Sequence, residues 1–397
     1  MSRTPKTFNL QFWLLCLSSF LFFCSFNMII PELPEYLTQL GGAEYKGLII
    51  SLFTLTAGLS RPFSGKLTDK VGRIPVMVFG SLMAAVSSLM YPFLTGLAGF
   101  FILRLVHGLA TGFKPTGTAA YIADIIPREK RGEALGILGV FLSLGMAAGP
   151  AIGSPIAIYL SLNTMFYVSS VLGLLSVVVL FGMKESLPKT ERFSLSLLKI
   201  SPGEVLEPNV YFPALIMILS AFSFGMVLTI IPDFSTHLGL QNKGIFFTYF
   251  TLSSIAVRIF AGKASDKYGR RVVLLIALIM LLIAMILLGF TRTYFTFIIA
   301  AIFFGQASGM TSPTIFAWTI DLASDEHRGR AMSTLYIALE IGIGLGALYS
   351  GWAYGNNPAN FAKTFWSGAM LALVAVIILI RFRHQKLPHV SRTNENH

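Results

Sequence analysis

Long apolar stretches of about twenty residues alternate with short polar segments along the whole chain. A stretch of that length is enough for a helix to cross the hydrocarbon core of a bilayer, which is roughly 30 Å thick. Because a chain inside hydrocarbon must satisfy its own backbone hydrogen bonds, we predict that each stretch is a helix. The pattern predicts twelve such helices, at residues 9–31, 46–65, 74–95, 97–123, 134–160, 163–183, 211–232, 244–262, 272–290, 293–319, 330–352 and 360–381.

The longest polar interruption, residues 184–210, divides these helices into six and six. It is basic and contains three prolines, and its segment FSLSLLKI is predicted to form a short helix on the membrane surface. We therefore expect an all-α membrane protein built from two six-helix bundles. The expected parts are an N-terminal bundle at 1–183, a linker at 184–210, a C-terminal bundle at 211–382 and a tail at 383–397.

One loop sequence occurs twice, half a chain apart. Residues 61–73 read RPFSGKLTDKVGR, and residues 258–270, which begin 197 positions later, read RIFAGKASDKYGR. The same offset carries seven further residues onto identical ones: Gly108, Gly112, Asp124, Arg131, Gly132, Gly145 and Gly149 onto Gly305, Gly309, Asp321, Arg328, Gly329, Gly342 and Gly346. The repeat predicts that the two bundles share one layout and are pseudo-symmetric, as in many membrane transporters.

Composition and charge fix the orientation. Hydrophobic residues make up 54% of the chain and charged residues 12%, against about 25% charged in soluble domains. The net charge of +12 is not spread evenly, because only four basic residues fall in the loops opposite the termini: Lys46, Lys243, Arg292 and Lys363. This bias places both termini and the linker in the cytoplasm and argues against a nucleic-acid partner.

Motifs of enzymes and ATP-driven pumps are missing from the sequence. It contains no H-E-x-x-H, no G-x-S-x-G and no P-loop ending in G-K-[ST]. Cys16 and Cys24 lie on one predicted helix about 12 Å apart, which is too far for a disulfide. We therefore expect no enzymatic activity, no cofactor and no metal.

The six-plus-six layout and the doubled G-K-x-x-D-K-x-G-R loop at 65–73 and 262–270 resemble the major facilitator superfamily. Within 134–160 a second pattern is similar to the glycine signature of drug:proton antiporters, G-x8-G-x3-G-P-x2-G-G, with Ser154 replacing the last glycine. That signature is formed by Gly136, Gly145, Gly149, Pro150 and Gly153. The resemblance implies a twelve-helix exporter driven by proton exchange. We expect Gly145, Gly149 and Gly153, on one helix face, to form a seam between the two halves.

By this resemblance, the doubled loop implies a cytoplasmic gate. Gly65 and Gly72 would allow a tight turn, Asp69 would face the start of 330–352, and Arg73 would pair with Asp124. The repeat adds Asp266 toward the start of 134–160 and a pair of Arg270 with Asp321. The gate residues are then Gly65, Asp69, Gly72, Arg73, Asp124, Arg131, Asp266, Arg270, Asp321 and Arg328. They would hold the cytoplasmic side shut; alternatively, they are solvated charges that only set the topology.

A polar stripe marks the predicted helix 97–123. Arg104, His107, Thr111 and Lys114 are spaced by three, four and three residues and so share one face. Ionisable groups at membrane depth are costly and face a cavity or a partner. With Glu32 they are candidates to line a central cavity and hold a substrate. The alternative is that Glu32 or Glu35 neutralises Arg104 internally. Arg61 and Arg258, equivalent in the repeat, are expected to reach the interface or to hold the loop that follows.

A proton antiporter needs a carboxylate that loads and releases a proton, and the candidates are Glu340, Glu32 and Asp124. A cationic amphipathic substrate would suit Glu32 or Glu340. An anionic metabolite, siderophore or lipid headgroup would suit the basic stripe, and a proton-coupled importer or sensor is a third possibility. The expected partners are a small molecule, protons and the bilayer. We expect a monomer in a bacterial plasma (inner) membrane.

Overall fold

The computed structural model describes residues 8–127, 130–200, 205–323 and 328–381, and this part of the chain is helical with no strand. The N-terminal helices are α1 (Leu10–Ile29), α2 (Leu33–Gln39), α3 (Lys46–Lys70), α4 (Arg73–Met90), α5 (Leu97–Ile125), α6 (Arg131–Tyr159) and α7 (Leu162–Phe181). The C-terminal helices are α8 (Tyr211–His237), α9 (Ile245–Tyr268), α10 (Arg270–Phe290), α11 (Tyr294–Leu322), α12 (Arg328–Tyr354) and α13 (Phe361–Arg381). The predicted all-helical class is confirmed for these residues.

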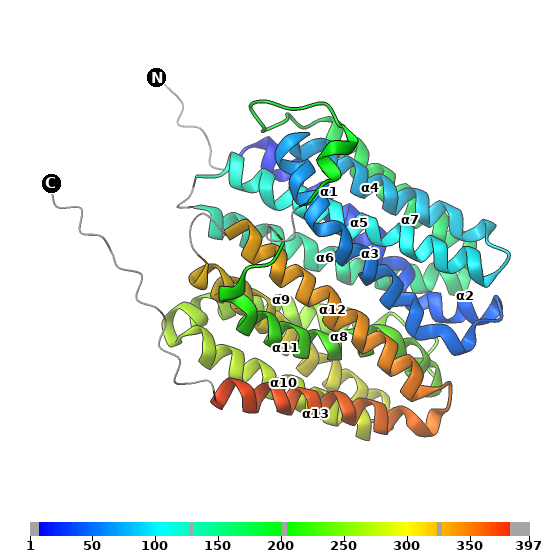
Figure 1. Cartoon of the computed structure of the whole chain (residues 1–397). Coiled ribbons are helices and arrows are strands. Elements are labelled where there is room, and N and C mark those ends of the chain that lie inside the picture. The colour runs from blue at the N-terminus through cyan, green and yellow to red at the C-terminus, as the bar shows by residue number, and fades with distance from the viewer. Residues whose placement is uncertain (1–7, 128–129, 201–204, 324–327, 382–397) are drawn as a thin grey trace.

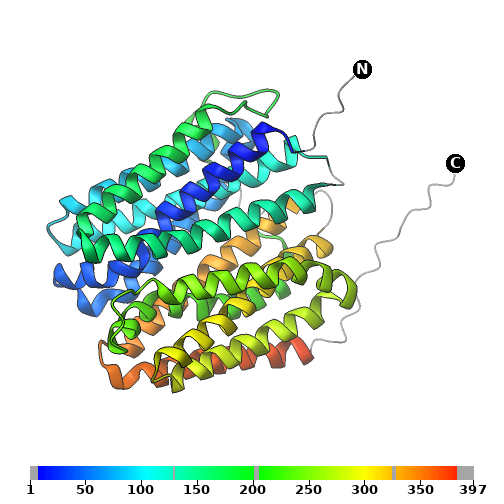
Figure 2. The ribbon, with the colours of Figure 1, turned by 180° about the vertical axis from the view of Figure 1, so that it is seen from behind.

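The helices lie in two groups, with α1–α7 on one side and α8–α13 on the other (Figures 1 and 2). Helix α3 packs along α12 and α6 packs along α9, and these two pairs join the groups. The start of α1 and the end of α13 lie at the same end of the molecule, which also holds the loops after α3 and α9 (Figure 1). We call this the loop-signature end and the opposite end, where α2 lies, the far end.

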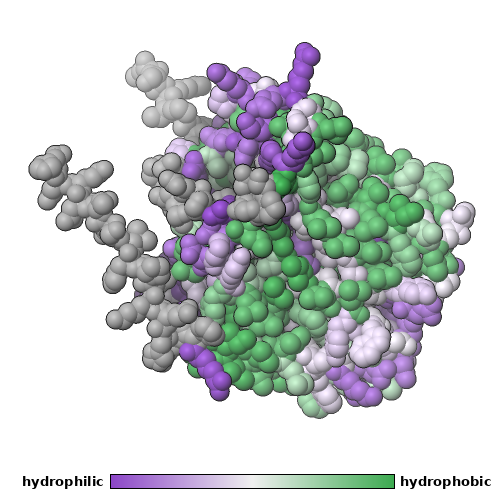
Figure 3. All heavy atoms as spheres, viewed as in Figure 1, coloured by the Kyte–Doolittle hydropathy of each residue, from purple (hydrophilic) through white to green (hydrophobic). Residues whose placement is uncertain are grey.

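The surface matches a protein that crosses a bilayer. On the face shown in Figure 3, apolar residues form a broad belt across the middle, and hydrophilic residues gather toward the two ends. Ten helices of the described part are long and apolar enough to span a membrane, or eleven if the bent pair Ile245–Arg258 and Phe260–Tyr268 is one span. Helix α3 falls outside this number because Arg61 and several serines and threonines dilute its apolar residues.

The predicted surface helix in the linker is wrong. Only a single 3-10 turn forms there, at Leu195–Leu198, and Leu197 is buried against Leu67, Val76 and Phe113. Lys66 also donates a hydrogen bond to the carbonyl oxygen of Lys199 at 2.6 Å. This part of the linker therefore packs on the N-terminal helices through Leu197 and Leu198, whose side chains pack against protein instead of lipid.

The three glycines predicted to form a seam, Gly145, Gly149 and Gly153, pack within one group of helices, not between the two groups. A Cβ atom added at Gly149 would lie 2.6 Å from the carbonyl oxygen of Cys24 and 2.8 Å from the amide nitrogen of Met28, both in α1. Gly145 and Gly153 approach the α1 backbone in the same way. The four-residue spacing correctly placed these glycines on one face, but it could not say which helix that face meets.

This geometry predicts that Gly149→Ala lowers the free energy of unfolding by about 1–3 kcal/mol, because neither backbone can retreat without disturbing the packing. The matched control is Gly136→Ala in the same helix, where an added Cβ meets nothing within 4 Å. Thermal unfolding of the detergent-solubilised protein measures both. Equal melting temperatures for the two variants would contradict this account of the seam.

Candidate functional site

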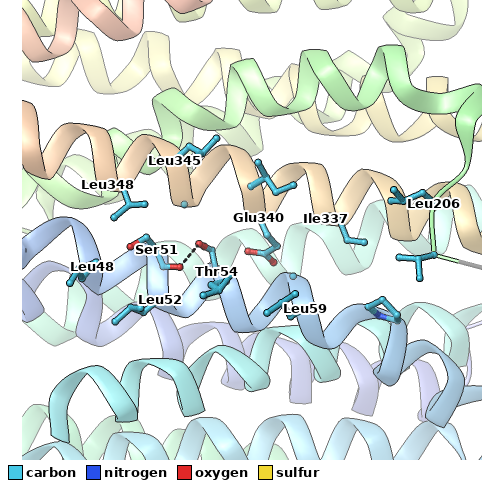
Figure 4. Close-up of a pocket in the computed structure, with 16 residues that line it drawn as sticks. Leu48, Ser51, Leu52, Thr54, Leu59, Leu206, Ile337, Glu340, Leu345 and Leu348 are labelled. Carbon is cyan, nitrogen blue, oxygen red and sulfur yellow. Dashed lines mark hydrogen bonds between the residues drawn. The ribbon is translucent and has the colours of Figure 1, made fainter. Parts of the chain in front are cut away.

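A groove of about 650 Å³ runs between α3 and α12, where the two groups of helices meet (Figure 4). Its walls are almost entirely aliphatic, and its residues are Leu48, Ser51, Leu52, Thr54, Leu55, Gly58, Leu59, Pro62, Val205, Leu206, Ile337, Glu340, Ile341, Gly344, Leu345 and Leu348. Leu59 is 63% exposed and Leu345 49%, so the groove opens onto the apolar belt. Its volume is typical of small-molecule sites, which are about 300–1,000 Å³.

Glu340 is the one charged residue among those that line the groove, and it points from α12 toward α3 (Figure 4). Its carboxylate accepts a hydrogen bond from Arg61 Nη2 at 3.1 Å. The Arg61 guanidinium also lies over the ring of Tyr336, 4.3 Å from its centroid. Both charged residues are buried, so this ion pair crosses between the two groups of helices.

The prediction that Arg61 reaches the membrane interface is therefore wrong. A long basic side chain extends to water when nothing inside the protein neutralises it. Here the Arg61 guanidinium reaches the carboxylate of Glu340 and the face of the Tyr336 ring, and these contacts stabilise its charge in the interior. Small residues permit the approach, since Gly58 leaves room beside the Glu340 side chain.

The polar stripe of α5 lies inside the N-terminal group. Arg104 is completely buried; its Nε donates to the carbonyl oxygen of Ile49 at 2.6 Å and its Nη1 to the Tyr91 hydroxyl at 3.1 Å. Its guanidinium also lies 4.8 Å from the ring centroid of Phe53. Glu32 does not neutralise Arg104, nor does Glu35, so that predicted alternative is wrong.

The rest of the stripe is also held within the N-terminal helices. His107 Nδ1 lies 3.4 Å from the Tyr91 hydroxyl, and Thr111 donates to Gly108 of its own helix. Lys114 is buried, and its Nζ donates to the Ser18 hydroxyl at 2.7 Å. These side chains do not line the groove between α3 and α12, and their contact with a substrate remains a prediction.

Sequence reasoning missed the partner of Lys114. The hydroxyls of Ser18 and Ser176 are hydrogen-bonded at 2.9 Å. Seven residues later in α1, the hydroxyl of Ser25 is hydrogen-bonded to that of Ser169 at 3.3 Å. These pairs join α1 to α7. Serines seven residues apart in both helices were the signal, because that spacing returns to one helix face.

At the loop-signature end, the predicted pairs within each repeat are present. Arg73 Nε bonds to Asp124 at 2.9 Å, and Arg270 Nε bonds to Asp321 at the same distance. Arg73 also bonds to Asp69 at 3.1 Å, and Arg270 bonds to Asp266. Each arginine thus ties the start of one helix to the ends of two others in its own group.

The predicted contacts between the groups at this end are not among those that the structure describes. Asp69 is largely exposed and is bound to Arg73 of its own group. Residues 324–327 and the side chain of Arg328 lie outside the described part. Arg131 donates to the carbonyl oxygens of Ala123 and Ile126, at the end of α5. The gating role of these residues remains a prediction.

The two glycines of the first loop differ in role. Gly72 has a φ of 134°, a backbone conformation that side chains other than hydrogen strongly disfavour. Gly65 lies inside α3, and an added Cβ there would meet nothing within 4 Å, so its predicted place in a tight turn is wrong. Sequence reasoning also missed Glu185, whose carboxylate accepts hydrogen bonds from the amides of Arg73 and Ile74 and caps α4.

The far end carries the ion pairs that cross between the groups outside the membrane core. Lys46 bonds to Asp233, and Lys243 bonds to Glu32 at 3.1 Å and to Glu35. Deeper in, a cavity of about 10 Å³ lies at the junction of α1, α6, α8 and α9, which has room for no more than about one water molecule. The two groups are therefore closed against each other at and below the far end.

Comparison with known proteins identifies similar sequences and folds. A sequence model described as Major Facilitator Superfamily matches residues 15–241 and 213–396. The "Staphylopine export protein" of Staphylococcus aureus (strain Mu50) is 24% identical over 347 residues, 84% of this chain and 85% of that protein. The "Multi-drug resistance efflux pump PmrA" of Streptococcus pneumoniae serotype 4 is 27% identical over 382 residues, 92% of this chain and 94% of that protein.

A solved structure shows the same fold. The human organic anion transporter MFSD10 (TETRAN) superimposes with a TM-score of 0.74 at 20% sequence identity, over 93% of this chain and 98% of that one. At this identity the likeness concerns the fold alone.

The buried ion pair predicts that Glu340→Leu lowers the free energy of unfolding by about 3–5 kcal/mol, because it strands the Arg61 charge in the interior. The double variant Arg61→Met/Glu340→Leu should regain most of that loss. The matched control is Glu133→Leu, which breaks the exposed pair with Lys130 and should cost about 1 kcal/mol or less. Thermal unfolding in detergent tests this. A double variant as unstable as Glu340→Leu would refute the ion-pair explanation.

Proposed function

This chain belongs to the Major Facilitator Superfamily, and from that premise we propose that it is a secondary transporter that exports small amphipathic molecules in exchange for protons. The observation that carries this proposal is the groove between α3 and α12. It combines apolar walls, the volume of a small-molecule site and a buried carboxylate that is paired across the two groups of helices. The relatives named as efflux and multidrug resistance proteins support export.

We infer the following coupling from the ion pair. When Glu340 is charged, it holds Arg61 and so holds α3 to α12. A proton on Glu340 removes that attraction, and a substrate with a cationic group competes with Arg61 for the same carboxylate. Substrate and proton would then exclude each other from one site, which is the requirement for exchange. Glu32 and Asp124 remain further candidates for proton transfer.

The loop-signature end would face the cytoplasm, since the excess of lysine and arginine lies there. The pairs of Arg73 with Asp124 and of Arg270 with Asp321 would make this end of each half move as one piece. With bacterial relatives of this kind, the location that fits is a bacterial plasma membrane. The protein would work there as a monomer.

An exporter of an anionic or zwitterionic molecule is the second candidate. One observation favours it: the Lys114 ammonium is buried without a carboxylate within 4 Å among the described residues. An unpaired buried cation is costly and calls for a negative partner. The relative named as a staphylopine exporter also supports this alternative.

The test is transport into liposomes with an imposed pH gradient, using a panel of amphipathic cations and organic anions. Exchange predicts that the substrate accumulates inside the liposomes when their lumen is acidic, whichever way the protein is inserted. Proton-coupled import predicts that the substrate accumulates inside when the outer solution is acidic. Glu340→Gln should abolish gradient-driven accumulation, because the neutral side chain cannot exchange a proton. It should retain counterflow of amphipathic cations only at raised substrate concentration, because it also binds a cationic group more weakly. Accumulation only with an acidic exterior would refute export.

Lys114→Met separates the two substrate classes. If the groove and Glu340 bind the substrate, this variant should transport amphipathic cations at close to the wild-type rate, since Lys114 lies inside the N-terminal group. Loss of transport confined to anionic compounds would establish the second candidate instead. Size-exclusion chromatography of the variant provides the folding control.

A further inference from the structure

The two ion pairs at the far end are reciprocal. Lys46, at the start of α3, bonds to Asp233 of α8, and Lys243, just before α9, bonds to Glu32 of the N-terminal group. The two lysines are 197 residues apart and so stand at equivalent places in the repeat. The carboxylates follow the matching sequences Ile-Ile-Pro-Glu and Ile-Ile-Pro-Asp. Each half therefore gives one lysine to the other half and receives one in return.

Of the two carboxylates, Glu32 has the more elaborate setting. It is only 3% exposed, and one of its oxygens accepts a hydrogen bond from the Ser154 hydroxyl at 2.6 Å while the other faces Lys243 Nζ at 3.1 Å. Ser154 stands where the antiporter glycine signature has glycine, which has no hydroxyl to donate. The departure from the signature is thus the residue that holds Glu32 in place.

A route for protons reaches this pair. A cavity of about 410 Å³ is lined by Glu32, Glu35 and Lys243 together with Ala157, Ile158, Leu162, Thr236, Gly239, Leu240 and Gln241. Its charged lining residues are these three alone, and its volume has room for several water molecules. Solvent from the far side can therefore carry a proton to a carboxylate that is otherwise buried.

Other titratable groups on the elements packed against Glu32 have partners of their own. The turn that holds Glu32 packs against α1, α2, α6 and α8. From α2, the Tyr36 hydroxyl donates to the carbonyl oxygen of Tyr91, and from α8, Asp233 is bound to Lys46 and His237 packs on aromatic rings. Cys24 of α1 and Tyr159 of α6 make no hydrogen bond or ion pair with Glu32 in the described part of the chain. The charges that touch or neighbour Glu32 are thus Lys243 and, through it, Glu35.

Lys243 keeps its charge over the range in which carboxylates titrate. Burial alone would lower the pKa of Lys243, but the carboxylates of Glu32 and Glu35 outweigh burial and leave that pKa raised. A raised pKa in the folded state means that the stabilisation from the lysine is lost only as the solution becomes strongly alkaline.

We propose that Glu32 is the proton-binding site of a far-end clamp, in which the Ser154 hydroxyl and Lys243 hold the charged carboxylate and a proton from the outer solution releases it. The inference rests on the proposed function and adds a gate to it. A proton that arrives through the 410 Å³ cavity binds a Glu32 oxygen and cancels its attraction to Lys243. The two halves then part at the far end, and the proton leaves Glu32 when the clamp forms again.

The experiment measures the width of the far end as a function of pH. Spin labels are placed on Gln39→Cys and Lys363→Cys, which are exposed at the far ends of the two groups, in a full-length chain with Cys16 and Cys24 replaced by alanine. Pulsed electron–electron double resonance in lipid nanodiscs then gives the distance between the labels. We expect the wild type to lengthen this distance as the solution is made progressively more acidic than neutral.

Three variants test the assignment. Glu32→Gln should show the long distance already at neutral pH. Ser154→Gly should move the midpoint of the change upward by about one pH unit, because it removes a hydrogen bond to the charged carboxylate. The matched control is Glu35→Gln, which removes the exposed carboxylate from the same lysine and should leave the far end closed at neutral pH. A short distance at neutral pH in Glu32→Gln, or an unshifted midpoint in Ser154→Gly, would overturn the proposal.

Transport in liposomes keeps this result separate from the proposed function. If acid-driven accumulation persists while the far-end distance ignores pH, the clamp is refuted and exchange stands. If the distance responds to pH in the predicted order of variants but no gradient drives transport, the clamp stands and proton exchange fails. Should Glu32→Gln not fold, the Ser154→Gly midpoint decides alone.

Discussion

A charged side chain inside a bundle that crosses hydrocarbon cannot be hydrated by bulk water, so the protein itself must supply its hydrogen-bond and ion-pair partners. Three solutions appear in this chain. Arg61 is neutralised by Glu340 and covered by an aromatic face. Arg104 is held by a carbonyl oxygen and a tyrosine hydroxyl. Lys114 is held by a serine that is itself bonded to another helix. Each solution joins helices, so the cost of burying these charges also determines which helices stay together.

The partners differ in whether they cross between the two groups of helices. Arg104 and Lys114 find theirs inside the N-terminal group, as Arg73 and Arg270 find theirs within their own groups at the loop-signature end. Bonds of this kind need not break when the halves move. Arg61 and the far-end lysines bond across the boundary. Opening the molecule therefore requires breaking a small set of ion pairs, while each half is stiffened by its own.

An ion pair could be predicted from the sequence when both of its residues recur in the internal repeat. The family resemblance implied the pair of Arg73 with Asp124. The offset then implied the pair of Arg270 with Asp321, because both members recur in register. The pair of Arg61 with Glu340 joins positions 279 residues apart, and no pattern in the sequence of either helix indicates the other as its partner. Glycine spacing predicted the packing face of α6 but not the helix that this face meets, which is α1. Glu185 was missed because a cap contributed by a linker leaves no periodic signal.

The small number of crossing pairs also sets the scale of the energy that must be supplied. One elementary charge moving through 100 mV releases about 2.3 kcal/mol, and a hydrogen bond to a charged group contributes roughly 1.5–3 kcal/mol. A single proton is therefore matched to one such contact and is too weak to undo an interior held throughout by crossing ion pairs. In this chain two of the three interior charges of the N-terminal half, Arg104 and Lys114, are bonded internally, and Arg61 bonds across the boundary. Under the proposed exchange, few ion pairs among the described residues would oppose the motion, and a proton that neutralises one carboxylate at a time would weaken them one by one.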